Sequence, residues 1–210
     1  MLRAPKKVTL TDYGTGQATE GLVSDIARTS LESPKVGQLL FRWVSYLTHV
    51  AGRPLTVVEL GTSLGISTAY LAAPDSRNRV VSFEGSRSLI EMAKLNWAKL
   101  HLINIETLEG NIDDTLPAWL QAQKKTPVDV AFIDANHTKE ATLRYLRLLL
   151  PSVQEKSLFI IDDIHYSPQM QEAWEEIKAM EEVTSTMDLY HCGLVFFDPH
   201  YLKKHYRLRI

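Results

Sequence analysis

Short apolar runs alternate with segments of helical periodicity along most of this chain. The run at residues 55–60 is nearly continuously apolar, which is typical of a strand buried on both faces of a parallel sheet, and further strands are expected at residues 79–84, 103–109, 128–134 and 157–162. Helical segments follow at residues 66–73, 86–102, 117–124, 138–150 and from Ser167 onward. Two closing β segments, at residues 184–190 and 193–197, are near enough in sequence to pair in antiparallel fashion. The pattern predicts an α/β fold: a doubly wound, mostly parallel sheet of about seven strands with a C-terminal antiparallel hairpin strand and helices on both faces.

The first 52 residues follow a different pattern. Residues 8–16 combine β-forming side chains with two glycines, which indicates a short extended segment and a turn. Ser33 and Pro34 then supply an N-cap and a first-turn proline for a helix that runs to about residue 50. We therefore predict one domain over residues 1–210, in which residues 1–52 form an N-terminal helical segment or lid and residues 53–210 form the core.

Composition and charge narrow the range of partners. The chain has 45% hydrophobic and 23% charged residues, as an ordinary globular protein does. Its formal net charge of -2 gives no reason to expect a nucleic-acid partner, and the basic cluster at residues 203–209 is interpreted as a solvated end. No apolar run approaches the roughly 20 residues that cross a bilayer, so no membrane partner is expected. The single cysteine, Cys192, cannot form an internal disulfide, which favours a cytoplasmic location.

The first candidate site is the glycine-rich turn at residues 59–65, between a predicted strand and a predicted helix. Gly61 and Gly65 permit positive φ angles and let a ligand approach the backbone closely. Their spacing differs from the dinucleotide fingerprint, so a dehydrogenase is disfavoured and a phosphate-free nucleoside ligand such as S-adenosylmethionine (SAM) fits better than NAD. Taken alone, a plain strand-to-helix connection explains this turn equally well.

Polar residues also follow the next two predicted strands. Glu84 ends the strand at 79–84, where an acidic side chain can accept both hydroxyls of a ribose, although an acid at the start of the next helix is the alternative. Because Glu84 comes one strand–helix unit after the glycine turn, we favour the nucleoside interpretation. After the third strand, Asn111 and Asp113 could hydrogen-bond an adenine while Ile112 packs on its face. Helix capping by Asp113 explains this segment equally well.

Acidic side chains end two later strands. Asp134 follows one of them, and Asp162 and Asp163 follow the other. The carboxyl ends of neighbouring parallel strands meet at one edge of a sheet, where ligands bind. Carboxylate oxygens suit a hard cation such as Mg²⁺ or Ca²⁺, and the flanking His137 and His165 could each act as a general base near neutral pH. Turn formation and helix capping by aspartate are the alternative.

Together these residues resemble the class I SAM-dependent methyltransferases, in particular the catechol and caffeoyl-CoA O-methyltransferase branch and its bacterial relatives. The likeness runs from about residue 33 to residue 165 and implies a Rossmann-like fold with SAM as the cofactor. In that family the glycine loop lies along the methionine part of SAM, Glu84 matches the ribose-binding acid, and the Ile112–Asp113 position holds the adenine. The cofactor-binding residues that we expect are Glu59, Gly61, Thr62, Ser63, Gly65, Ser67, Glu84, Gly85, Asn111, Ile112, Asp113 and Asp134.

The resemblance also assigns roles at the later strand ends. Asp134 matches an aspartate that touches both the amino group of SAM and a metal ion. Asp162 and Asp163 match an Asp-Asn metal pair, with Asp163 in place of the usual asparagine. His137 falls where the catechol enzymes carry a catalytic lysine. The resemblance thus implies His137 and Asp134 as catalytic residues, and Asp134, Asp162 and Asp163 as ligands of Mg²⁺ or Ca²⁺.

The function that this implies is transfer of a methyl group from SAM to a hydroxyl of a small molecule, with or without help from a metal ion. The alternatives are an N-methyltransferase and a non-catalytic SAM-binding or assembly module of the same fold. The amphipathic segment at residues 17–50 could cover the site of the methyl acceptor or form a homodimer contact.

Overall fold

The computed structural model describes residues 7–12, 17–22, 33–123 and 126–208. The chain divides into two compact units. The first unit consists of residues 1–54 and 61–116, and the second of residues 55–60 and 117–210.

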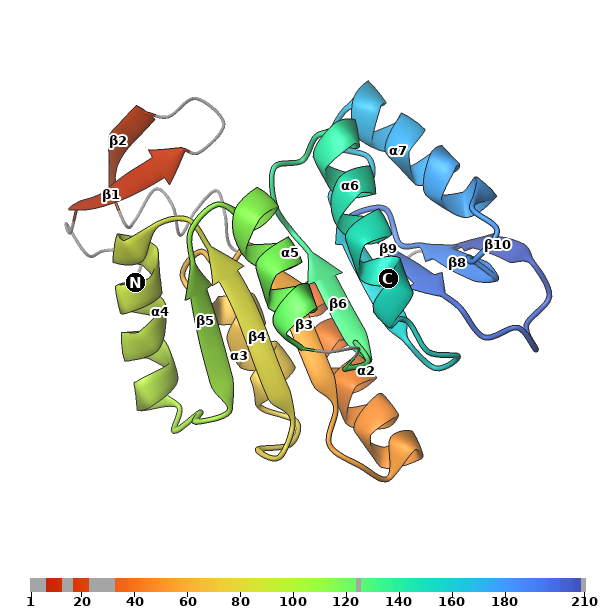
Figure 1. The fold of residues 1–210 in the computed structure, drawn as a ribbon, viewed down its shortest axis with the longest axis horizontal. Helices are drawn as coiled ribbons and strands as arrows, with labels where there is room; N and C mark the ends of the chain where they lie inside the picture. The colour runs from red at the N-terminus through yellow and green to blue at the C-terminus, as the bar shows by residue number, and fades with distance from the viewer. Residues whose placement is uncertain (1–6, 13–16, 23–32, 124–125, 209–210) are drawn as a thin grey trace. The chain divides into compact units, whose positions relative to one another are not determined.

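Among its described residues, the first unit contains two pairs of strands and three complete helices. Its strands are β1 (Lys7–Asp12), β2 (Gln17–Leu22), β4 (Arg79–Glu84) and β5 (Ile105–Glu109), and its helices are α2 (Pro34–Ala51), α3 (Ile66–Ala72) and α4 (Arg87–Lys99). Strands β1 and β2 pair in antiparallel, and β4 and β5 pair in parallel (Figure 1). The chain leaves this unit within α5 (Ile112–Ala122).

The second unit is a mixed sheet with helices. Its strands are β3 (Thr56–Leu60), β6 (Val130–Ile133), β7 (Leu158–Asp162), β8 (Ser185–Asp188), β9 (Cys192–Phe196) and β10 (Lys204–Arg207). They lie in the order β10-β8-β9-β7-β6-β3, with β3, β6 and β7 parallel and β9 antiparallel to both of its neighbours. Helices α6 (Lys139–Leu149) and α7 (Pro168–Ala179) pack side by side (Figure 1), and a 3₁₀ turn at Leu150–Ser152 follows α6.

Local sequence signals place the helix ends. The hydroxyl of Ser33 accepts a hydrogen bond from the Val36 N–H, and Pro34 begins α2, as predicted. Gly52 ends the same helix in a left-handed conformation, with φ 64°. Ser86, Thr138 and Ser167 cap α4, α6 and α7 through their hydroxyls. Strands β3, β4, β6 and β7 are almost entirely buried, whereas β5, which leads to Asn111, is partly exposed.

The predicted alternation of parallel strands and helices is confirmed, and so is the antiparallel pairing of the last two predicted β segments. Two expectations were wrong in detail. Residues 17–22 of the expected N-terminal helical segment form a strand, and the helix expected from Pro117 begins at Ile112. Residues 13–16, at the end of the expected extended segment and turn, lie outside the described residues. Residues 204–207 of the basic tail are exposed, as expected of a solvated end, and they also form β10, which pairs in parallel with β8.

Candidate functional site

The glycine turn of the first unit is held by backbone hydrogen bonds to β4. Gly61 has φ 102° and Gly65 has φ 74°, so both adopt conformations that favour glycine. The N–H groups of Gly61 and Thr62 both donate to the Phe83 carbonyl, at 3.0 and 3.2 Å. The Gly65 N–H closes the turn on the Thr62 carbonyl at 2.8 Å. The turn is therefore shaped before any ligand arrives.

The carboxylate of Glu84 joins this turn to the start of α4. It accepts hydrogen bonds from the N–H groups of Ser63 and Ser86, each at 2.8 Å. Burial raises the pKa of Glu84, against the opposing effect of these N–H donors. Each carboxylate oxygen keeps further acceptor capacity, so the same group can also receive a hydroxyl donor.

Helix α4 supports the other side of the turn. The indole N–H of Trp97 donates to the Gly65 carbonyl at 2.7 Å, and the amide of Asn96 donates to the Leu64 carbonyl at 3.0 Å. A Cβ atom on Gly65 would lie 2.6 Å from the Trp97 ring nitrogen and 2.7 Å from the Cβ of Ala93. The apolar periodicity of this helix marks Trp97 as a core residue and gives no sign of these hydrogen bonds.

The remaining residues expected to bind the cofactor have varied surroundings. Thr62 is buried and its hydroxyl contacts Ser82 and the Phe83 carbonyl. Ser67 is buried inside α3 and Glu59 inside β3, while Gly85 is partly buried after β4. The Oγ atom of Ser63 is buried without a hydrogen-bond partner among the described residues.

Asn111 begins the helix that follows β5. Its side-chain oxygen accepts a hydrogen bond from the Asp113 N–H at 3.1 Å, and its carbonyl accepts one from the Thr115 hydroxyl at 2.9 Å. Ile112 is 9% exposed. Helix capping therefore occurs at this segment through Asn111 rather than through Asp113.

Asp134, His137 and Asp163 form a cluster in the second unit. The Nε2 atom of His137 lies 3.5 Å from Oδ1 of Asp134, and its Nδ1 atom lies 3.7 Å from Oδ2 of Asp163. Both distances exceed hydrogen-bonding range, so neither carboxylate holds a ring nitrogen of His137 in a short hydrogen bond. The ring of Tyr166 lies 5.8 Å from that of His137. The predicted catalytic pair, His137 and Asp134, is thus brought together within this unit.

The backbone around this cluster is unusual. Asn136, His137 and Asp163 have φ values of 63°, 40° and 53°, a region that residues other than glycine seldom adopt. The amide of Asn136 donates to the Tyr145 hydroxyl at 2.6 Å, and the Asp163 N–H donates to the His191 carbonyl at 2.7 Å. Strained residues held by such contacts concentrate at functional sites.

The three carboxylates expected to bind a metal are arranged differently. Asp162 is 5% exposed at the end of β7, whereas Asp163 has a left-handed φ of 53° and its Oδ2 atom lies 3.7 Å from Nδ1 of His137. No group of three His, Cys, Asp or Glu side chains in the described ranges could hold a metal ion. The set Asp134, Asp162 and Asp163 therefore does not fit Mg²⁺ or Ca²⁺ in this arrangement.

A second histidine is paired with a buried acid that the sequence did not single out. His165 contacts Asp188 at 3.0 Å, and Arg207 of β10 donates to the same carboxylate oxygen at 3.1 Å. Burial tends to raise the pKa of Asp188, but the Tyr190 N–H, His165 and Arg207 together hold it below the usual value. The exposed ring of Tyr190 stacks on His165 with a centroid distance of 5.4 Å.

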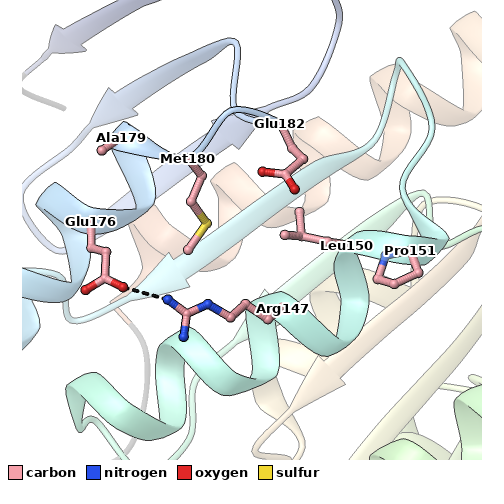
Figure 2. A pocket seen from close by; sticks show the side chains of 7 residues that line it. All are labelled: Arg147, Leu150, Pro151, Glu176, Ala179, Met180 and Glu182. Atoms are coloured by element: carbon pink, nitrogen blue, oxygen red, sulfur yellow. Dashed lines mark hydrogen bonds and ion pairs between the residues drawn. The ribbon is translucent and has the colours of Figure 1, made fainter.

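A groove of about 690 Å³ lies between the last turns of α6 and α7 (Figure 2). An ion pair between Arg147 and Glu176, at 2.6 Å, crosses it, and Met180 and Leu150 line its apolar part. The groove lies near the end of α6, whereas Asp134 and His137 precede its first residue. An 11-residue helix is about 16 Å long, so this groove is separate from the Asp134–His137 cluster.

Residues 58–164 match the model of a family described as methyltransferase domain. The matched stretch contains the glycine turn, Glu84 and the Asp134–His137–Asp163 cluster, and it spans more than half of the chain. The chain belongs to this methyltransferase family. A comparison with curated proteins gives no significant match.

Several solved structures of methyltransferases share the fold. The O-methyltransferase from Bacillus cereus in complex with S-adenosylhomocysteine (SAH) has 24% identity and a TM-score of 0.67, with 80% of this chain and 83% of that chain covered. TomG from Streptomyces achromogenes, an O-methyltransferase of tomaymycin synthesis in complex with SAM, has 21% identity and a TM-score of 0.67, with 80% and 81% covered. A putative caffeoyl-CoA O-methyltransferase from Staphylococcus aureus has 18% identity and a TM-score of 0.60, with 82% and 96% covered.

These matches confirm the expected Rossmann-like methyltransferase fold. They do not test the residue assignments, which stay predictions. No helix in the described part of the chain is both long and apolar enough to cross a membrane.

Proposed function

We propose that this methyltransferase transfers the methyl group of SAM to a hydroxyl group of a small molecule. The observation that carries the proposal is the family match, because one continuous stretch includes both the glycine turn and the Asp134–His137 cluster. The B. cereus and Streptomyces enzymes, which share the fold, are O-methyltransferases in complex with SAH and SAM. The cytoplasmic location and the homodimer contact stay predictions.

Two side chains of the first unit support binding of SAM. Glu84 presents a carboxylate of the kind that accepts ribose hydroxyls, and the buried Ser63 hydroxyl has no hydrogen-bond partner among the described residues. The turn is already formed by its hydrogen bonds to β4, so binding does not have to order it. SAM, when bound, supplies a methyl group that its sulfonium already activates.

The second unit has a group suited to proton removal. His137 has a side chain 32% exposed, and each of its ring nitrogens faces a carboxylate beyond hydrogen-bonding distance. A neutral imidazole can therefore accept the proton of an acceptor hydroxyl, and the adjacent Asp134 and Asp163 stabilise the imidazolium that results. We assign no step to a metal ion, because the three carboxylates do not fit one as arranged.

Calorimetry followed by a turnover assay tests the proposal. We expect SAM and SAH to bind with micromolar affinity, equally with Mg²⁺ and with a chelator. The protein is then incubated with methyl-labelled SAM and matched sets of small phenols, alcohols and amines, and SAH formation is measured. Methylation of hydroxyl compounds supports the proposal. Methylation of amines alone, or absence of SAM binding, contradicts it.

A further inference from the structure

We infer that Asn96 and Trp97 of α4 are positioning residues that set the shape of the glycine turn and thereby the affinity for the methionine part of SAM. The inference rests on the proposed use of SAM. It concerns side chains that lie outside the predicted cofactor-binding set and that act through the backbone of the turn.

The two residues hold adjacent carbonyl groups at the end of the turn. The Asn96 amide donates to the Leu64 carbonyl at 3.0 Å, and the Trp97 indole donates to the Gly65 carbonyl at 2.7 Å. Trp97 is 4% exposed and Asn96 is 8% exposed, so both donors are held away from water. Buried hydrogen bonds of this kind fix a single geometry, because breaking one leaves an unsatisfied polar group.

The turn has a support on each side. The Phe83 carbonyl and the Glu84 carboxylate hold the N–H groups of its first half. Asn96 and Trp97 hold the carbonyl groups of its second half. The peptide planes are therefore fixed at both ends of the turn. Binding of a ligand then does not have to order this backbone, which avoids an entropy cost.

Gly65 shows how closely α4 approaches. A Cβ atom there would meet the Trp97 ring and Ala93 at less than 3 Å. The absence of a side chain at Gly65 thus allows the helix to reach the turn, in addition to permitting φ 74°. The sequence alone indicates a positive φ and the approach of a ligand at this glycine, and not the approach of α4.

The test compares Asn96 with Asn104, whose side-chain amides both donate to backbone carbonyls but in different parts of the first unit. Asn104 also donates its amide to backbone carbonyls of the first unit, those of Ala72, Asp75 and Asn78 at 3.1–3.2 Å. It precedes β5 and lies by the start of β4, whereas the turn contacts the end of β4. Asn104→Ala therefore controls for loss of a partly buried amide that donates to backbone carbonyls, without loss of support for the turn.

Calorimetry measures the affinities of the wild type and of N96A, W97F and N104A. For SAH we expect a roughly three- to ten-fold rise in Kd in N96A and in W97F, and no change in N104A. The binding of 5′-methylthioadenosine, which keeps the nucleoside but lacks the amino-acid part, should be the same in all four proteins. The inference would be overturned if N96A and W97F bound SAH as tightly as the wild type does, or if N104A lost as much SAH affinity as they do.

Amide hydrogen exchange of the free protein separates this inference from the proposed function. In N96A and W97F, we expect residues 61–68 to exchange at least several-fold faster than in the wild type and in N104A. Unchanged exchange at these residues would overturn the positioning role whatever the protein binds. Failure of the wild type to bind SAH would instead overturn the proposed cofactor, and with it the claim about affinity.

Discussion

The glycine turn of the first unit and the turns that follow β6 and β7 in the second unit, which contain His137 and Asp163, are held in different ways. In the glycine turn, Gly61, Ser63 and Gly65 all have positive φ, and hydrogen bonds of 2.7–3.2 Å hold the N–H and carbonyl groups. In the turns after β6 and β7, His137 and Asp163 also have positive φ, but their side chains contact at only 3.7 Å. Both regions therefore contain strained backbone, and they differ in how it is held. Short hydrogen bonds fix the glycine turn, whereas the second region places loosely paired charges around a histidine that can exchange a proton.

The largest effect that would test this contrast is expected at His137. In H137A, kcat should fall by roughly 10³-fold, or about 4 kcal/mol in activation free energy, because a general base is removed. The Kd for SAM and the melting temperature should stay close to wild type, since no short hydrogen bond to the ring is lost. Labelled-SAM turnover, calorimetry and thermal denaturation measure the three quantities.

The matched control for this variant is H200A, in which an exposed histidine paired with Asp198 is removed. Its kcat should equal that of the wild type. An H137A protein with wild-type kcat would remove His137 from the mechanism, and a melting temperature many degrees lower would show that the cluster is structural.

Gly65→Ala should give the next largest effect, this time on stability. The substitution combines a positive φ with a collision against Trp97 and Ala93, so the free energy of unfolding should fall by about 3 kcal/mol. Gly52→Ala is the control, because Gly52 has φ 64° but nothing within 4 Å of a Cβ atom. It should cost only about 1 kcal/mol. Equal losses in the two variants, measured by urea denaturation, would mean that the approach of α4 is unimportant.

The elements that lead to both turns were predictable because they are simple. Strand β7 is continuously apolar up to Asp162, and β4 has an apolar centre that ends at Glu84, so both acidic residues are visible as breaks in the apolar pattern. The hydroxyl caps were equally visible, since serine before proline is a local signal that does not depend on the rest of the fold.

The elements and contacts that were not predicted depend on interactions that sequence periodicity does not encode. Pro117 indicated a helix start, but Asn111 caps the helix earlier and Pro117 lies inside it. Strand β10 consists of exposed and mostly polar residues, so only its pairing with β8 defines it. The hydrogen bond of Trp97 joins residues 32 positions apart. The closeness of Asp163 to His137 was expected from the neighbouring strand ends, but the positive φ of both residues is not specified by their residue types.

Glu84→Gln probes a side chain that holds the glycine turn and is also proposed to bind the ribose of SAM. One end of the Gln amide would face an N–H donor of Ser63 or Ser86 with an NH₂ group, so we expect about a tenfold higher Kd for SAM. Glu91→Gln, at an exposed ion pair with Arg87, should leave the Kd unchanged. Because burial raises the pKa of Glu84, wild-type affinity should begin to fall on acidification at a higher pH than an ordinary glutamate would cause. Equal pH profiles for the wild type and E84Q would contradict this role.

The smallest expected effect concerns Asp188, which shows that the second unit also contains a tightly held charge. The Tyr190 N–H, His165 and Arg207 keep its pKa below the usual 3.8 in the folded state, despite its burial. A lowered carboxyl pKa stabilises the fold above the pKa of the unfolded chain, and this stabilisation disappears as the pH falls through the folded-state value. D188N should therefore be less stable than the wild type by about 1 kcal/mol at pH 7, and the difference should shrink below about pH 4. Urea denaturation across this pH range measures it. If the difference in stability stayed constant with pH, Asp188 would stabilise the fold through its hydrogen bonds and not through its charge. This part of the second unit would then be held as the glycine turn is, by hydrogen-bond geometry.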